Sequence, residues 1–469
     1  MPRMVGAFAM RVTVIGTGYV GLTTGACLAG VGHEVVCVDI LPERVDAINR
    51  GESPFYEPGL DKLLSESLAN GRLRATTELA ESVAASEVTL IAVGTPQASD
   101  GRIDLSYVAE AARQIGAALR DAGGYHVVAV KSTVVPGTTD GLVRSALEEA
   151  SGLAAGEFGL CMNPEFLREG SAVYDFNSPD RIVIGQWDER SGRVLAGLYE
   201  SFDCPKIFTT LRNGEMIKYA SNSLLATLIS FSNEIAALCE ATPGTDVEAV
   251  LGGVHLDRRL SPFVEGGGRM RPELLSFLRA GCGFGGSCLP KDVSALRAYA
   301  REHSVEPRIL DAVLKVNSSR PAQLVRLAEE ALGTLEGSTV AVLGLAFKPG
   351  TDDLRESPSL PVVKLLSEKG ATVRTYDPMF ASRPSGLRVG EDVAFCATAE
   401  EALRDADAAL VVTGWPEFAE ADWAALCGVM RRRVIVDGRN VLRGVEWPEG
   451  ATYLTIGRSL EGGAAAAGL

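Results

Sequence analysis

The sequence has few of the residues from which metal centres and disulfide frameworks are built. Its four histidines, at positions 33, 126, 255 and 303, stand far apart among 469 residues, and no C-x-x-C pair occurs. Nine cysteines are scattered without regular spacing, an odd number that favours a reducing compartment such as the cytoplasm. The sequence therefore predicts no metal site and free thiols.

Features of membrane and nucleic-acid-binding proteins are also lacking. No run of about 18 uncharged apolar residues occurs, so we expect no transmembrane helix. The opening stretch MPRMVGAFAMRV has too few apolar residues for a signal peptide. The net charge is −15, which argues against nucleic acid or an anionic membrane as a partner. A phosphorylated ligand held by a few local cations remains compatible with this charge.

What the chain does have is α/β alternation on both sides of a helical stretch. Apolar strand-like runs occur in the ranges 12–15, 34–40, 88–96, 126–138 and 158–166, and again in 337–347, 371–378, 408–415 and 432–440. Between them, residues 213–240 and 307–332 carry apolar side chains at helical spacing. The predicted fold class is α/β, with two Rossmann-like doubly wound domains joined by a helical region with a long central helix. The predicted segments are 1–208, 209–328 and 329–460, followed by a disordered tail, 461–469.

A glycine-rich turn follows the first predicted strand. The run GTGYVG places Gly16, Gly18 and Gly21 where glycine permits a tight turn, close approach of a pyrophosphate and helix packing. Asp39 ends the second predicted strand, where a carboxylate accepts hydrogen bonds from a ribose diol and repels a 2′-phosphate. The pattern predicts an NAD site, and the alternative is a generic turn with a surface aspartate.

Polar residues follow later strands of the same segment. Thr95 in VGTP and Thr133 in KSTVVPGTT lie where strand carboxyl ends line a ligand crevice, so they are candidates for contact with a cofactor or a water. Glu165 and Glu169 stand four residues apart in NPEFLREG. The plainer alternatives are ordinary strand-end turns for the threonines and the solvated start of a helix for the glutamates.

The long helix carries a candidate polar pair. Lys218 and Asn222 are four residues apart and therefore lie on one face, one turn from each other. The apolar neighbours Met216, Ile217 and Ala220 suggest that the Lys218 ammonium is partly buried. The alternative is an ordinary surface lysine on an amphipathic helix.

Cys288 stands in the run GCGFGGSCLPKD with unusually small neighbours. Glycines at positions 283, 285 and 286 let the backbone crowd against a ligand and leave the sulfur reachable. Lys291 and Asp292 follow within one turn, and a nearby cation favours the thiolate over a thiol of ordinary pKa, about 8.5. The setting suits a nucleophile, with Asp292 placed to orient or deprotonate a water.

A third cluster of charges lies in the stretch LGLAFKPGTDDLRESP. Lys348 and Arg355 occupy a polar loop at a strand end, which suggests an anionic ligand. The alternative is a solvated loop of balanced charge, because Asp352, Asp353 and Glu356 lie beside the two cations.

With these residues assembled, the chain resembles the UDP-glucose/GDP-mannose dehydrogenase family over nearly its whole length. The resemblance rests on eight motifs in order: GTGYVGL, YEPGL, VGTP, KSTVVPGT, NPEFLREG, EMIKYASN, GFGGSCLPKD and GLAFKPGTDDLRESP. It implies a homodimer or higher homo-oligomer that oxidises the C6 alcohol of a nucleotide sugar to a carboxylate with two NAD per turnover. In that scheme Cys288 adds to the aldehyde, and the thiohemiacetal becomes a thioester that water hydrolyses.

The resemblance also assigns roles to the matching positions. Lys218 and Asn222 would stabilise the developing oxyanion, Asp292 and Thr133 would hold the water, and Glu165 would act as acid or base. The residues that would line the NAD site are Gly16, Gly18, Gly21, Asp39, Arg44, Thr95, Thr133, Glu169, Lys291 and Arg355, the last often across a subunit boundary. Those that would hold the nucleotide sugar are Glu165, Phe166, Leu167, Lys218, Asn222, Phe284, Gly285, Phe347, Lys348, Arg439 and, reaching the neighbouring subunit, Arg259.

The identity of the sugar nucleotide is less constrained. By the resemblance, UDP-glucose is preferred, because DGRN supplies Arg439, a sugar-site cation that the GDP-mannose branch lacks. SCLPKD and STVVPGT lean toward that branch instead. TDP-glucose stays open because one methyl group is worth only about 1–3 kcal/mol in a pocket. GSC at 286–288 argues against N-acetylated sugars, and the stretch after Arg259 is longer than the family usually shows. The other classes are a two-electron hydroxyacid dehydrogenase, which needs no nucleophilic cysteine, and a non-catalytic sensor of NAD or a nucleotide sugar.

Overall fold

The structure, a computed structural model, describes residues 9–459 except 122, 381, 385–388 and 391–392. Contacts divide the chain into two compact units with their boundary after Ser221, inside the long helix α9 (Leu211–Ala241). The predicted tail, 461–469, lies outside the described residues. The three predicted segments stay a prediction, because α9 contributes to both units.

The first unit is built on an eight-stranded sheet in the order β3-β2-β1-β4-β5-β6-β7-β8. Neighbouring strands are parallel except β6 and β7, which are antiparallel. The strands are β1 (Arg11–Ile15), β2 (Glu34–Val38), β3 (Leu73–Thr76), β4 (Val88–Ile91), β5 (Val127–Val130), β6 (Gly159–Met162), β7 (Ile182–Gln186) and β8 (Lys206–Thr210). Because β1 lies between β2 and β4, the strand order reverses there, which opens a crevice at the carboxyl ends of these strands.

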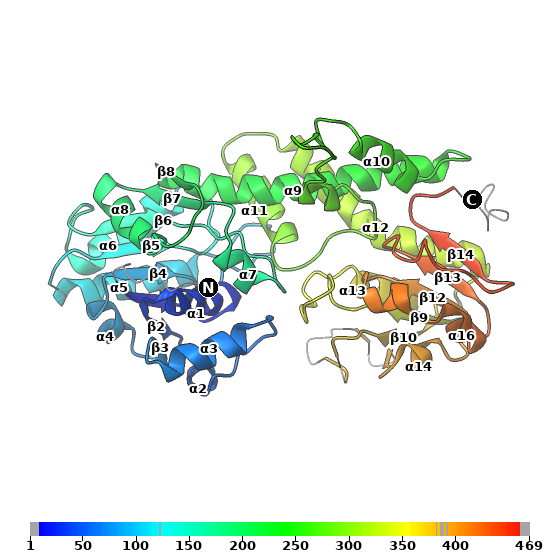
Figure 1. Cartoon of the computed structure of the whole chain (residues 1–469), viewed down its shortest axis with the longest axis horizontal. Helices are drawn as coiled ribbons and strands as arrows, with labels where there is room; N and C mark the ends of the chain where they lie inside the picture. Colours follow the sequence, from blue (N-terminus) through cyan, green and yellow to red (C-terminus); the bar gives the residue numbers. More distant parts are fainter. Residues whose placement is uncertain (1–8, 122, 381, 385–388, 391–392, 460–469) are drawn as a thin grey trace. The chain divides into compact units, whose positions relative to one another are not determined.

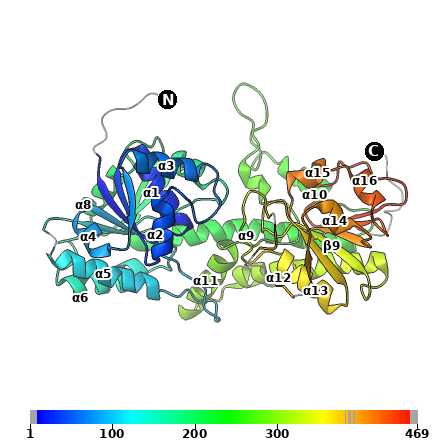
Figure 2. The ribbon, with the colours of Figure 1, turned by 90° about the horizontal axis from the view of Figure 1, so that it is seen from below.

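Helices cover both faces of this sheet and bury its apolar strands. The helices are α1 (Tyr19–Val31), α2 (Pro42–Asn49), α3 (Leu60–Ala69), α4 (Leu79–Ala84), α5 (Ser106–Asp121), a π-helical turn η1 (Thr138–Val143), α6 (Arg144–Ser151), α7 (Ala172–Asn177) and α8 (Glu189–Gly197). One core cluster joins α1, α2, α3, α7 and α8 to the sheet, and another joins α4, α5 and α6 to it. Figure 2 shows α5 and α6 side by side. The unit is therefore a three-layer, doubly wound domain.

The second unit repeats this strand order on a six-stranded parallel sheet, β11-β10-β9-β12-β13-β14. Its strands are β9 (Thr339–Leu343), β10 (Thr372–Tyr376), β11 (Ala394–Phe395), β12 (Ala408–Val411), β13 (Val434–Asp437) and β14 (Thr452–Thr455). Helices α13 (Ser359–Glu368), α14 (Ala399–Leu403), α15 (Pro416–Glu420) and α16 (Trp423–Gly428) belong to the same α/β part. The predicted fold class, two doubly wound domains with a long helix between them in sequence, is confirmed.

The remaining helices of the second unit precede its sheet in sequence. They are the second half of α9, then α10 (Val247–His255), a 3₁₀ turn η2 (Glu273–Ser276), α11 (Leu289–Glu302) and α12 (Arg308–Leu332). Figure 1 shows α9, in green, as one long uninterrupted helix. The packing of α9, α10, α12 and α13 on the sheet forms one core cluster, and α14, α15 and α16 pack in another.

The opening turns of the two sheets are built alike. Gly344 after β9 has φ +95° and donates its backbone N–H to Tyr376 at 2.7 Å, as Gly16 after β1, with φ +92°, donates to Val38 at 2.8 Å. Asp377 accepts from the N–H of Leu345 at 2.6 Å, as Asp39 accepts from the turn after β1. Because α13 begins only at residue 359, however, the second turn does not lead directly into a helix N-terminus.

Candidate active site

The glycine turn after β1 has the geometry that a dinucleotide requires. Gly16 adopts the left-handed region, which costs other residues strain. A Cβ on Gly21 would lie 1.9 Å from the Gly16 carbonyl oxygen, so only glycine lets α1 pack this close. A Cβ on Gly18, the N-cap of α1, would meet nothing within 4 Å. The backbone at Gly18 is therefore open to a ligand, and the N-terminus of a thirteen-residue helix, α1, points its N–H groups there.

Asp39 is buried and ionised beside this turn. Its carboxylate accepts hydrogen bonds from the Thr17 backbone N–H at 2.9 Å and from the Leu41 N–H at 3.1 Å, and the Arg44 guanidinium lies 3.4 Å away. Burial alone would raise the pKa of Asp39, but these donors hold it below its usual value. The surface-aspartate alternative is wrong, since Asp39 is 6% exposed. An ionised carboxylate here fits a ribose diol and disfavours a 2′-phosphate, so the residues present fit NAD.

The other predicted cofactor residues of this unit lie at neighbouring strand ends. The Thr95 hydroxyl, beyond β4, donates to the Thr133 carbonyl at 3.1 Å, which ties the loops after β4 and β5 together. Glu169 is half-buried in the turn that follows the β6 loop. The geometry brings the two threonines together, and their proposed contacts with NAD or water stay predictions.

Glu165 and Lys218 form a buried ion pair. Lys218 Nζ lies 2.9 Å from Glu165 Oε1, and the side chains are 4% and 6% exposed. The Leu167 N–H donates to the other carboxylate oxygen at 2.6 Å. Burial would raise the pKa of Glu165, but Lys218, the Leu167 N–H and the more distant Lys131 hold it below its ordinary value. The alternatives of a solvated glutamate at a helix start and a surface lysine are both wrong: Glu165 lies in a loop and both groups are buried.

Aromatic and cationic groups surround this pair. The Phe166 ring lies 5.5 Å from Lys218 Nζ and 4.0 Å from the Arg181 guanidinium carbon. Cations over an aromatic face are stabilised by its quadrupole, more strongly where water is excluded. The predicted substrate residues Phe166 and Leu167 therefore support the Glu165–Lys218 pair directly.

Asn222, one turn beyond Lys218 on α9, takes part in a second polar cluster. Its side-chain N–H donates to Asp292 Oδ2 at 2.6 Å, and Lys291 Nζ lies 2.6 Å from Asp292 Oδ1. Asp292 is 1% exposed. The structure thus brings three predicted site residues together. Lys291, predicted to contact NAD, forms an ion pair with Asp292, and the carboxylate holds Asn222 through its other oxygen.

Cys288 occupies the N-cap position of α11, where the partial positive charge of a helix terminus favours an anion. Its sulfur is half-buried and lies 3.5 Å from the Ser287 hydroxyl. This partial exposure agrees with the prediction that the thiol can be reached by a ligand. Its role as a nucleophile stays a prediction.

The glycines before Cys288 serve a purpose other than the one predicted. A Cβ on Gly285 would lie 2.2 Å from the Glu356 carbonyl, and one on Gly286, which has φ +82°, would lie 2.8 Å from the Phe347 ring. The loop therefore packs against the 344–358 loop of its own chain rather than leaving space for a ligand at these Cβ positions. The expectation of backbone crowded against a ligand is corrected for Gly285 and Gly286.

The remaining predicted sugar-site residues of the second unit anchor the same loop. Arg439 donates from Nη1 to the Gly283 carbonyl at 2.9 Å and from Nε to the Val412 carbonyl at 2.6 Å. Phe284, which is 7% exposed, exchanges backbone hydrogen bonds with the Asn317 side chain at 2.8 and 3.0 Å. The Lys348 ammonium lies 5.6 Å from the centre of its neighbouring Phe347 ring. The contacts of Arg439 and Asn317 hold the segment that leads into Cys288, whereas the Lys348 contact is local to its own loop.

Two predicted arginines are exposed and form local ion pairs. Arg355 Nε lies 2.8 Å from Asp353 Oδ1, and Arg259 Nη2 lies 2.6 Å from Asp257 Oδ2. The Arg355–Asp353 pair agrees with the alternative that charges within the 344–358 loop balance one another. The roles predicted for both arginines involve a neighbouring subunit, and they stay predictions.

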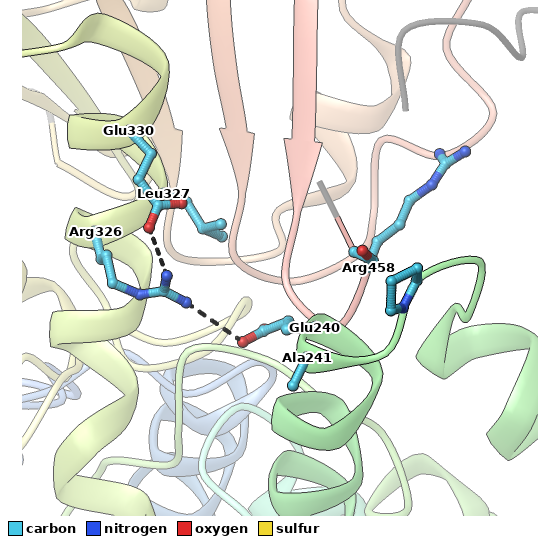
Figure 3. A pocket seen from close by; sticks show the side chains of 8 residues that line it. Glu240, Ala241, Arg326, Leu327, Glu330 and Arg458 are labelled. Atoms are coloured by element: carbon cyan, nitrogen blue, oxygen red, sulfur yellow. Dashed lines mark hydrogen bonds and ion pairs between the residues drawn. The ribbon is translucent and has the colours of Figure 1, made fainter. Parts of the chain in front are cut away.

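The second unit also has a cavity of about 320 Å³ that is lined by other residues than the predicted site residues. Its lining residues are Glu240, Ala241, Pro243, Arg326, Leu327, Glu330, Arg458 and Ser459. Figure 3 shows the Arg326 guanidinium between Glu240 and Glu330. Arg326 pairs with both carboxylates, and none of the predicted site residues lines the cavity.

Sequence reasoning missed Lys131. It stands directly after β5, two residues before Thr133, and is 4% exposed. Its ammonium donates to Asn163 Oδ1 at 3.1 Å, and the Tyr199 hydroxyl donates to the same oxygen at 2.6 Å. The sequence did contain a signal for this residue, because a charged side chain that directly follows a fully apolar strand lies at the strand end where ligands bind.

Comparison with known proteins places the chain among nucleotide-sugar dehydrogenases. The UDP-glucose/GDP-mannose dehydrogenase family matches by its NAD binding domain at residues 10–203, its central domain at 212–319 and its UDP binding domain at 341–444. A UDP-glucose 6-dehydrogenase of Rhizobium meliloti is 43% identical, covering 96% of this chain and all of the relative. A GDP-mannose 6-dehydrogenase of Azotobacter vinelandii is 43% identical over 78% of this chain and 81% of its own. The solved UDP-glucose dehydrogenase of Pyrobaculum islandicum has a TM-score of 0.87 at 41% identity, covering 98% of this chain and all of that one.

A doubly wound domain with an open glycine turn and a buried, ionised carboxylate beside it is the arrangement of NAD-dependent oxidoreductases. The chain belongs to the UDP-glucose/GDP-mannose dehydrogenase family and is an NAD-dependent nucleotide-sugar dehydrogenase.

Proposed function

We propose that the protein oxidises the C6 alcohol of UDP-glucose to the uronic acid in two successive two-electron steps. The observation that carries the proposal is the pair of buried polar clusters on one turn of α9, Lys218 with Glu165 and Asn222 with Asp292. A buried charge is costly to keep unless it is used or compensated, so such clusters favour a catalytic site. Cys288 at the start of α11 supplies the nucleophile for the second step.

In the first step, the alcohol loses a proton and a hydride and becomes an aldehyde. NAD, when bound, accepts the hydride, and the glycine turn and Asp39 would hold it. Lys218 and Asn222 donate hydrogen bonds to the sugar oxygen, which carries negative charge as its proton leaves. Glu165, ionised beside Lys218, is the group that takes up a proton.

In the second step, the Cys288 thiolate forms a C–S bond to the aldehyde carbon, and the oxygen gains a proton to give a thiohemiacetal. Loss of a second hydride and a proton gives a thioester. Water activated by Glu165 then attacks this carbonyl, the C–S bond breaks and the thiolate leaves. Alcohol, water and two NAD⁺ thus yield carboxylate, two NADH and three protons.

UDP is the nucleotide that best fits the second unit. The family's UDP binding domain matches residues 341–444, and Arg439 of that segment anchors the loop before Cys288. The relatives oxidise either UDP-glucose or GDP-mannose by name. The same chemistry on TDP-glucose or GDP-mannose is therefore the second candidate.

The decisive experiment is the number of NADH molecules formed per sugar consumed with UDP-glucose, TDP-glucose and GDP-mannose. We expect a ratio of two and a preference for UDP-glucose. A ratio of one would remove the thioester step and favour a two-electron hydroxyacid-type dehydrogenase. No NADH from any of the three would contradict the proposed function altogether.

We further infer that the enzyme is a homodimer or higher homo-oligomer. Leu224, Phe231 and Leu238 recur every seven residues on α9 and are 54%, 49% and 60% exposed. Seven residues make nearly two helical turns, so these side chains form one apolar stripe that a second α9 can cover.

Phe231→Glu tests this inference, because it places a charge in the middle of the stripe. We expect the mass measured by light scattering to fall toward that of one chain. Ile309→Glu, at an exposed apolar residue of α12, is the matched control and should leave the mass unchanged. An unchanged mass for Phe231→Glu would contradict the inference.

We infer a cytoplasmic location from the thiols and from α9. All nine cysteines are free. By length and composition α9 could cross a membrane, but core helices of soluble proteins pass the same test. Its buried polar groups, among them Glu215, Lys218 and Asn233, favour a core helix. Recovery of the activity in a membrane pellet would contradict this location.

A further inference from the structure

Lys131 carries a buried positive charge for which the proposed steps provide no use. Its ammonium sits at the carboxyl end of β5 and is held by Asn163 Oδ1 at 3.1 Å. Asn163 is in turn fixed by the Tyr199 hydroxyl at 2.6 Å and by its own N–H donated to the Val183 carbonyl at 2.9 Å. The lysine therefore occupies one well-defined position inside the first unit.

This arrangement is costly for a merely structural side chain. An ammonium at 4% exposure loses its hydration, and Asn163 is a neutral partner. A methionine would fill similar space without that cost. The Tyr199 ring, 6.0 Å from the ammonium, offsets part of this cost. Strands β5 and β6 pair with Val130 opposite Met162, so Lys131 and Asn163 follow side by side. Glu165, two residues beyond Asn163 in the same loop, is the carboxylate that acts on Lys131.

We propose that Lys131 is a positioning residue for the oxidation: its ammonium, fixed by Asn163, is a second cation that keeps the Glu165 carboxylate ionised opposite Lys218. The inference rests on the proposed role of Glu165 as acid or base. Lys131 does not touch the reacting atoms in this scheme; it acts through Glu165.

The charged groups around Glu165 determine how this contribution depends on pH. Lys218 from α9 contacts the carboxylate, and Lys131 from the end of β5 acts on it over a longer distance. The Arg181 guanidinium lies over the neighbouring Phe166 ring at 4.0 Å. Burial lowers the pKa of Lys131 to about 8, with Glu165 opposing and Lys218 reinforcing that change. Lys131 is therefore charged below about pH 8 and neutral above it.

The experiment is the pH profile of kcat for Lys131→Met beside the wild type. Removing a cation raises the pKa of Glu165, so the acid limb should move to higher pH by about one unit. The two profiles should converge about two pH units above the shifted limb, where Glu165 is ionised in both proteins. Lys131→Arg keeps the charge and should restore the limb. An unmoved limb, or a loss of kcat that is equal at every pH, would overturn the proposal.

Two further measurements separate charge from packing and from the proposed function. Tyr199→Phe removes a hydrogen bond to Asn163 without changing any charge, so its acid limb should stay where the wild-type limb lies. The free energies of unfolding of Lys131→Met, Glu165→Gln and the double variant at pH 7 measure the interaction between Lys131 and Glu165. This measurement requires no turnover. We expect Lys131→Met to change stability differently once Glu165 is uncharged. Equal effects in both backgrounds would overturn the inference even if no nucleotide sugar is oxidised.

Discussion

Cys288→Ser is expected to reduce steady-state NADH formation by roughly a factor of 10³ or more, in line with the loss of a nucleophile in covalent catalysis. The serine hydroxyl nearly keeps the size of the side chain at the N-cap of α11 but is a much poorer nucleophile, because it forms almost no anion at neutral pH, whereas a thiol forms a reactive thiolate fraction. Hydride loss from the alcohol does not need the thiol. The variant should therefore form at most one NADH per sugar and stall while it handles the aldehyde.

Rapid mixing with excess NAD and a trapping amine for aldehydes measures this outcome. Cys282→Ser is the matched control, because Cys282 lies six residues earlier in the same loop, is fully buried and donates to the Val412 carbonyl. The control should keep two NADH per sugar. Full turnover with two NADH by Cys288→Ser at a near-normal rate would rule out the covalent scheme.

The NAD half of the site could be predicted in detail because its signals are local. A glycine turn, the strand before it and Asp39 lie within 30 residues, and each glycine has a steric reason that holds for any such turn. The strands that the sequence revealed are the apolar ones next to these motifs. Strands β3, β8, β11 and β14, which lie at the edges of the sheets, were missed, and so was β7, an interior strand with no motif beside it.

The burial of Glu165 and its pairing with Lys218 could not be predicted, because both depend on a contact between residues 53 positions apart. NPEFLREG alone is polar enough for a solvated turn, and only the packing of α9 against that loop makes the glutamate a buried ion. The glycines near Cys288 likewise depend on contacts with residues that are distant in the sequence. Their motif was visible, but the steric reason for glycine lies in Glu356 and Phe347, about 60 to 70 residues away.

Lys218→Met is expected to lower kcat on the order of 10²–10³-fold, the usual cost of losing one donor to a developing oxyanion. The methionine keeps the length and the apolar contacts of the lysine stem but removes its charge. It also leaves the Glu165 carboxylate buried without its closest cation, 2.9 Å away in the wild type. Breaking such a pair from one side costs about 3–5 kcal/mol of stability.

Activity and stability can be separated by a second substitution. Glu165→Gln in the Lys218→Met background removes the unpaired buried charge, so much of the lost stability should return, as measured by urea unfolding. The activity should not return, because the double variant lacks both the donor and the acid or base. Lys364→Met, at an exposed lysine whose ammonium lies 3.8 Å from Glu368, should change neither quantity.

The pattern of outcomes identifies what the buried pair does. If the pair served stability alone, the double variant would recover its rate together with its fold, and the catalytic assignment of Lys218 would be wrong. If the pair serves catalysis, the double variant should recover its stability while its kcat remains low. A buried ion pair is weak evidence for stability by itself, since apolar residues of similar size often replace one without loss. Placing this pair in the reaction therefore predicts the second pattern.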